Sequence, residues 1–157
     1  LMVGKDTDSG LVICEIPSAD LLRADNMDLE EDTKKAIGNN SSLISSRNTK
    51  ATSTAAKNNR NATVEEGEQN LTIQMKQLYE DVLLKKSELQ AAWTAFQKAQ
   101  GQKQNADIKY KAGLLSQEEY LSEEMNYISQ TAAYKAVDLA FTQAADTYGW
   151  AVMGITQ

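Results

Sequence analysis

Few side chains in this sequence could carry out covalent or metal chemistry. Its 157 residues include no histidine and a single cysteine, Cys14. Without histidine, Ser-His-Asp and Cys-His catalysis, His-ligated zinc and a haem held by a proximal histidine are all excluded. Cys14 lies between Ile13 and Glu15 and has no basic neighbour that would favour its thiolate, so it indicates a buried or incidental thiol.

A cluster of carboxylates in the second half of the chain is one candidate metal site. The cluster contains Glu118, Glu119, Glu123 and Glu124. Di-metal carboxylate sites in helical bundles take inward-facing glutamates together with Glu-x-x-His pairs, and this chain has no histidine. We therefore favour a solvated face that complements the start of a helix. The sequence predicts no catalytic residue, no metal and no cofactor.

Composition and charge narrow the class of protein further. Charged residues make up 24% and hydrophobic residues 41%, so the chain is neither disordered nor membrane-spanning by composition. The net charge of −6 argues against a nucleic-acid partner bound through a basic surface. No apolar run approaches the roughly 20 residues that cross a bilayer. Aromatic residues are only 6%, which predicts a thin core.

The first part of the chain, residues 1–27, is expected to be irregular. Gly4, Gly10 and Pro17 interrupt it, around a short apolar run at residues 11–16. The chain opens Leu1-Met2-Val3-Gly4 without an initiator methionine, so we expect a fragment or a processed piece. The rest of the chain, residues 28–157, is expected to form a single helical hairpin domain.

Three helices are predicted in that domain. The first begins with Asp28 as N-cap and runs to about Arg60, with a solvated or frayed second half and a turn at residues 58–63. The second runs from Val64 to about Ala112 on a heptad pattern, which indicates a supercoiled seam. Its seam residues are Leu71, Met75, Leu78, Val82, Leu89, Trp93 and Phe96.

The third helix, at about residues 116–151, carries the most regular pattern in the sequence. Gly113 is expected to end the preceding helix in the left-handed conformation, and Ser116 with Glu119 forms a capping box for this one. Aromatic residues then recur every seven positions, which we interpret as a packing seam rather than a ligand site. They are Tyr120, Tyr127, Tyr134, Phe141 and Tyr148. Both outer helices are expected to overlap beside residues 75–96, with Trp93 and Phe96 in the best-packed section.

Three segments in order resemble motifs of the TolC-like outer-membrane efflux family. Residues 28–40, Asp-Leu-Glu-Glu-Asp-Thr-Lys-Lys-Ala-Ile-Gly-Asn-Asn, resemble the start of its first helix. Residues 110–116, Tyr-Lys-Ala-Gly-Leu-Leu-Ser, followed by Glu-Tyr-Leu at 119–121, resemble its glycine-containing turn. Residues 146–154, Asp-Thr-Tyr-Gly-Trp-Ala-Val-Met-Gly, resemble its closing motif. The opening Leu1-Met2-Val3-Gly4 resembles the end of a first repeat, so the match suggests the second of two repeats.

The resemblance implies an all-α fold of TolC-like α-barrel type, built from long antiparallel coiled-coil helices: short, very long and returning. It implies a non-catalytic component of an envelope efflux or export system, outside the cytoplasmic membrane. Partners would be the preceding repeat, further copies of the chain (a trimer in that family) and a periplasmic adaptor-type hairpin protein. Gly113, Leu114 and Ser116 would form the tip that contacts that adaptor.

One departure from the family keeps a second function open. The family inserts two membrane β-strands between its first and long helices, whereas here residues 58–67 are polar and do not alternate. We expect a stalk without those strands, closed by a helical turn. The alternatives are a structural or adaptor coiled coil that self-associates without a transport role and, more weakly, a carboxylate metalloprotein.

Overall fold

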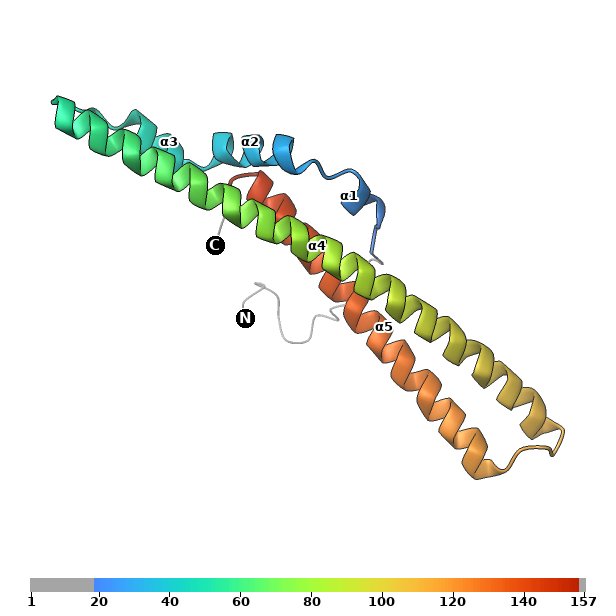
Figure 1. The fold of residues 1–157 in the computed structure, drawn as a ribbon. Coiled ribbons are helices and arrows are strands. Elements are labelled where there is room, and N and C mark those ends of the chain that lie inside the picture. Colours follow the sequence, from blue (N-terminus) through green and yellow to red (C-terminus); the bar gives the residue numbers. More distant parts are fainter. Residues whose placement is uncertain (1–18, 156–157) are drawn as a thin grey trace, which may run out of the picture.

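The computed structural model describes residues 19–155, and within them every regular element is an α-helix. The order is α1 (Leu22–Asp25), α2 (Leu29–Asn39), α3 (Ser41–Asn48), α4 (Thr54–Lys111) and α5 (Gln117–Val152). Figure 1 shows α4 as a rod along the whole molecule, with α2 and α3 beside its first half and α5 beside its second. The predicted all-helical fold with long helices is therefore confirmed for this part of the chain.

The longest helix, α4, has 58 residues and begins ten residues earlier than its seam predicted. Ser53 caps it by accepting a hydrogen bond from the Ala56 amide at 3.2 Å. The predicted turn at residues 58–63 is wrong, because this segment lies inside α4. Asn and Thr favour turns locally, but a capped helix continues through them once its later turns pack against other helices.

The return helix α5 has 36 residues and matches its predicted position closely. The Ser116–Glu119 capping box is confirmed, with both reciprocal hydrogen bonds formed. Gly113 ends the preceding segment with φ of 72°, as the sequence predicted for a left-handed helix end. α4 and α5 form an antiparallel hairpin whose tip lies at residues 112–116 (Figure 1).

The predicted first helix over residues 28–60 is wrong in its extent. Asp28 does cap its start, by accepting from the Glu31 amide at 3.0 Å. The helix then stops at Asn39, because Asn40 takes an extended conformation and caps α3 through the Leu43 amide. Residues 49–53 reverse the chain into α4. The segment expected to be irregular also contains one helical turn, α1; residues 1–18 lie outside the described part of the chain.

The core lies where α2, α4 and α5 meet, rather than around Trp93. Met75 and Val82 of α4 are fully buried, together with Ala36 of α2 and Phe141 and Tyr148 of α5. Trp93 is 43% exposed, so the prediction that it lies in the best-packed section is wrong. The chain reverses at residues 49–53, earlier than expected, and this places α2 beside the Met75 region of α4 instead.

Within residues 19–155, none of the helices combines the length and the apolar character that a bilayer span requires.

Candidate functional site

The hairpin tip is the best-defined candidate site, and backbone hydrogen bonds define its conformation. The Gly113 amide donates to the Tyr110 carbonyl at 3.0 Å, and the Leu114 amide donates to the Lys109 carbonyl at 2.9 Å. These bonds satisfy the last carbonyls of α4 and require the left-handed conformation at Gly113. A turn held this way points the next side chain away from both helices, and Leu114 is 76% exposed.

Ser116 positions the tip and has little capacity left for a partner. Its hydroxyl lies 3.3 Å from the Glu119 amide and 2.7 Å from a Glu119 carboxylate oxygen, and its own amide donates to that carboxylate at 2.9 Å. These hydrogen bonds from Ser116 lower the pKa of the Glu119 carboxyl. Ser116 is therefore engaged as the N-cap of α5 and Glu119 as the second member of its capping box, and the exposed apolar group of the tip is Leu114.

A small polar and aromatic cluster braces the hairpin just behind the tip. Tyr110 of α4 stacks on Tyr120 of α5, with ring centroids 4.5 Å apart and planes inclined by 19°. The Lys103 ammonium lies 2.9 Å from both Asp107 carboxylate oxygens and 5.7 Å from the Tyr120 ring centroid. Lys103 lowers the pKa of the Asp107 carboxyl, and the nearby Asp107 raises the pKa of the Tyr120 phenol.

The aromatic stripe of α5 faces α4 along the hairpin. Phe96 lies between Tyr127 and Tyr134, with centroids at 6.0 and 5.5 Å, and Trp93 is 5.2 Å from Tyr134. Further along, Tyr79 lies 6.2 Å from Tyr148. Of the α4 seam residues, Val82 and Leu89 are buried, Leu78 and Phe96 are half-buried and Trp93 is exposed. These contacts hold the two helices in one register and so fix the position of the tip.

Long-range polar contacts tie the N-terminal helices to α5. The buried Tyr148 phenol donates to the Asp32 carboxylate at 2.9 Å, and the Asn39 amide donates to the Val152 carbonyl at 3.0 Å. Arg23 pairs with Asp146 at 2.7 Å. Sequence reasoning missed these pairs because their partners lie more than 100 residues apart, at separations of 113 to 123 residues. No periodic pattern links one member to the other.

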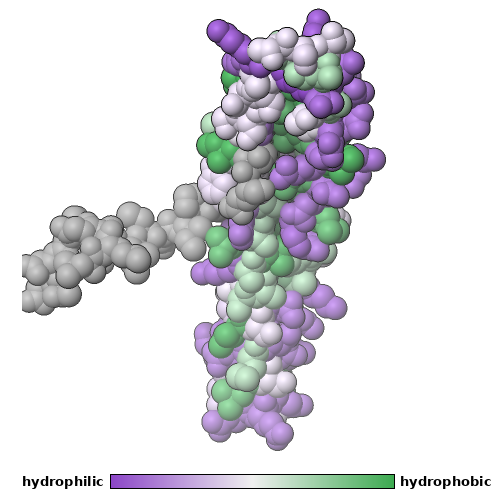
Figure 2. All heavy atoms as spheres, turned by 90° about the vertical axis from the view of Figure 1, so that its left-hand side faces the viewer, coloured by the Kyte–Doolittle hydropathy of each residue, from purple (hydrophilic) through white to green (hydrophobic). Residues whose placement is uncertain are grey.

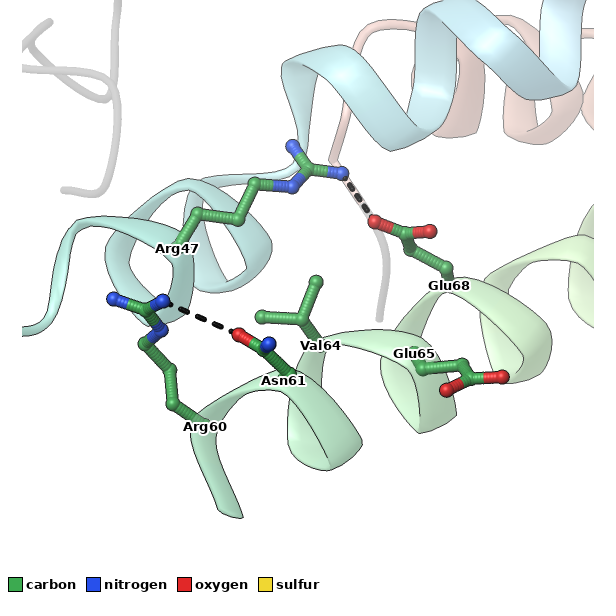
Figure 3. Close-up of a pocket in the computed structure, with 6 residues that line it drawn as sticks. All are labelled: Arg47, Arg60, Asn61, Val64, Glu65 and Glu68. Atoms are coloured by element: carbon green, nitrogen blue, oxygen red, sulfur yellow. Dashed lines mark hydrogen bonds and ion pairs between the residues drawn. The ribbon is translucent and has the colours of Figure 1, made fainter. Parts of the chain in front are cut away.

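A second candidate site is the open hollow of about 360 Å³ near the start of α4, drawn in Figure 3. Arg47 pairs with Glu68 at 2.9 Å and donates to the Ile37 carbonyl at 3.3 Å. Arg60 donates to Asn61 and to the Thr49 carbonyl, both at 3.2 Å. Because these bonds hold α3 and the reversal against α4, we interpret the two arginines as structural. The sequence analysis did not single them out.

The carboxylate cluster is not brought together as a ligand set. Glu119 is engaged by Ser116, and Glu118 is exposed at the start of the helix. Across residues 19–155, no three or more Cys, His, Asp or Glu side chains come close enough together to hold a metal ion. Cys14 lies outside the described residues.

Comparison with known proteins found no matching family model, no matching curated protein and no matching solved structure. The geometry of the tip and of the helical faces is therefore the basis for the function proposed below.

Proposed function

We propose that this chain is a non-catalytic helical component of a TolC-like envelope export system, with the hairpin tip as its partner-contacting surface. The observation that carries the proposal is the tip: an exposed Leu114 on a turn formed by the left-handed Gly113 and the capping box at Ser116. It lies at the end of a two-helix rod, in the segment whose residues resemble the turn of that family.

An exposed apolar side chain on a defined turn is suited to binding and not to chemistry. Truncation costs about 2 kcal/mol or more at the few positions that dominate a protein interface, where the partner closes around the side chain. The nearby ionisable groups are already engaged in caps and ion pairs: Glu119 with Ser116, and Asp107 with Lys103. The proposed partner is a protein that offers a complementary helical hairpin.

Exposed apolar residues along the rod support an assembly of several helices. Leu83 and Leu84 of α4 are 41% and 55% exposed, on faces that the described chain leaves uncovered. A preceding repeat or further copies of the chain would cover such faces, as the TolC-like arrangement requires. The proposed location is the cell envelope, outside the cytoplasmic membrane, and it rests on the resemblance to that family.

A second candidate is a structural or adaptor coiled coil that self-associates without transporting anything. The observation that favours it is the unbroken α4, which runs through residues 58–67, where the TolC-like family interrupts its helices with an insertion. In this case the exposed faces would serve self-association alone.

The test is Leu114→Asp in the native protein in its own cells, with Ile73→Asp as the matched control. Both residues are exposed, at 76% and 56%, so neither change should alter helicity. We expect Leu114→Asp to abolish adaptor binding and export while Ile73→Asp preserves both. If Leu114→Asp left both functions intact at unchanged helicity, the proposal would be wrong and the self-associating coiled coil would take its place.

A further inference from the structure

The outer side of α5 carries an apolar seam that nothing in the described chain covers. We define the outer α5 seam as Leu121, Met125, Ile128, Ala132 and Leu139, spaced by four, three, four and seven residues. Its four large members are 46%, 70%, 58% and 47% exposed. Figure 2 shows a column of apolar residues down the lower half of this side of the molecule, with hydrophilic residues on both flanks.

This seam is separate from the aromatic stripe that faces α4. Leu121 and Ile128 directly follow Tyr120 and Tyr127, and successive residues of an α-helix are rotated by about 100°. The outer seam therefore lies about a quarter of a turn away from α4 along its whole length. Its own hairpin partner cannot bury it.

The composition of this stretch is unlike that of a solvated helix. From Met125 to Val137 the only charged residue is Lys135, whereas a helix face exposed to water normally carries many charges. A heptad-spaced apolar seam of this kind is the pattern by which one helix packs along another. The seam indicates a helical partner rather than a small molecule.

We propose that the outer α5 seam binds the outer α5 seam of a second copy of this chain, with the two helices antiparallel. One charged residue decides both which partner we propose and how the two helices are oriented. In the heptad of this seam, Lys135 occupies a core position equivalent to those of Leu121 and Ile128. A partner with a negative charge at the level of Lys135 would stabilise that lysine in the interface, and the chain itself carries such a charge.

Between the in-register parallel pair and the antiparallel pair, the antiparallel one provides that charge. In a parallel pair, equivalent positions meet, so Lys135 would face Lys135 of the second copy across the core, which is repulsive. In an antiparallel pair crossing near residue 130, Lys135 lies opposite Met125 and beside Glu124 of the second copy. Within residues 19–155 neither Lys135 nor Glu124 takes part in an ion pair of its own, so both are available.

The same crossing matches the apolar residues in size. Leu121 meets Leu139 of the second copy at both ends, and Ile128 meets Ala132 at the centre. Large residues thus face each other where the helices diverge, and a large residue faces a small one where they approach. The seam is about 27 Å long at 1.5 Å per residue, which is short for a stable interface and predicts a dissociation constant in about the micromolar range.

This inference deepens the self-association that both proposed functions involve, by naming the surface and the direction of the pairing. The two tests stay distinguishable, because partner contact and export are measured with variants of Leu114 and self-association with variants of Ile128.

The first test is sedimentation equilibrium of the 157-residue chain and two matched variants. We expect a monomer–dimer equilibrium that Ile128→Glu weakens by about tenfold or more, because it places a charge in the centre of the seam. Ile108→Glu changes an isoleucine of similar exposure, 67%, on α4 and should leave the equilibrium unchanged. A chain that stays monomeric at about 100 μM, or equal effects of the two variants, would overturn the proposal.

The second test is of direction. Lys135→Glu should weaken the dimer, and adding Glu124→Lys should restore it, since the exchanged charges meet again. Spin labels at Ser122→Cys, in a Cys14→Ser background, should lie about 25 Å apart in the antiparallel dimer and about 10 Å apart in a parallel one. A failure of the charge exchange to restore binding, or the short distance, contradicts the antiparallel arrangement.

Discussion

Two glycines of the hairpin provide a test of how its tip is built. Gly113 has φ of 72°, and a Cβ atom added there meets no atom within 4 Å. Gly101 is helical inside α4, and a Cβ atom added there also meets none within 4 Å. Alanine at either position therefore changes only the backbone contribution to the free energy of unfolding, without a clash or a new contact.

The two substitutions should change the free energy of unfolding in opposite directions. Gly113→Ala forces an L-residue into the left-handed region and should lower the free energy of unfolding by about 1 kcal/mol. Gly101→Ala removes conformational freedom from the unfolded chain and should raise it by about 0.5–1 kcal/mol. The difference between the variants is then about 1.5–2 kcal/mol.

Urea denaturation followed by far-ultraviolet circular dichroism measures both changes, provided that the m-values agree. Gly113→Asn is the control, because asparagine tolerates the left-handed conformation better than alanine and should cost less. If Gly113→Ala stabilised the chain as Gly101→Ala does, the turn would not be left-handed and the geometry assigned to the tip would be refuted.

Three further predictions concern the junction of α2, α4 and α5. Phe141→Ala should lower the free energy of unfolding by about 3–5 kcal/mol, because Phe141 is 1% exposed. Phe96 is half-buried, so Phe96→Ala should lower it clearly less. Equal losses in denaturant titrations would contradict the position of the core. Burial raises the pKa of the Tyr148 phenol, so the unfolded chain ionises first and the free energy of unfolding should fall as the pH rises above about 10. This fall should be smaller in Tyr148→Phe. Equal pH dependence of the two proteins would exclude a contribution from Tyr148. Gly154→Ala would place a Cβ atom in a clash with the Asn39 carbonyl oxygen at φ of 83°, so amide hydrogens at the end of α5 should exchange faster. Unchanged protection there would show that the contact does not form.

The parts of the fold that depend on local signals were predictable from the sequence. The seven-residue aromatic repeat and the Ser116–Glu119 pair locate α5, and Gly113 locates the end of the long helix. Each of these signals acts within one helix or one turn, so the residues that carry it lie close together in the sequence. Asp28 likewise marks the start of α2 without reference to any other part of the chain.

The path of the N-terminal helices was not predictable in the same way. Asn40 ends one helix and caps the next, while the asparagines at 58, 59 and 61 lie inside α4. The sequence offers similar polar residues in both places. Tertiary packing decides between them, because Leu43 is buried in the common core, next to Gly67 of α4.

The position of the chain reversal explains why the core was predicted in the wrong place. Moving the reversal from residues 58–63 to residues 49–53 shifts the N-terminal helices relative to α4. The three-helix section then forms around Met75 and Val82, and Trp93 is left at its edge. The contacts that complete the junction, such as Tyr148 with Asp32, depend on this register and leave no pattern in the sequence.

The central claim is that the tip of the α4–α5 hairpin contacts a partner in the cell envelope. Its most direct test is photo-crosslinking in the native cells from a photoreactive residue introduced at Leu114, followed by fractionation. The account predicts an envelope-located adduct with a second protein, absent when the photoreactive residue is introduced at Ile73 instead. A chain found in the cytosol, with no adduct from position 114, would contradict it.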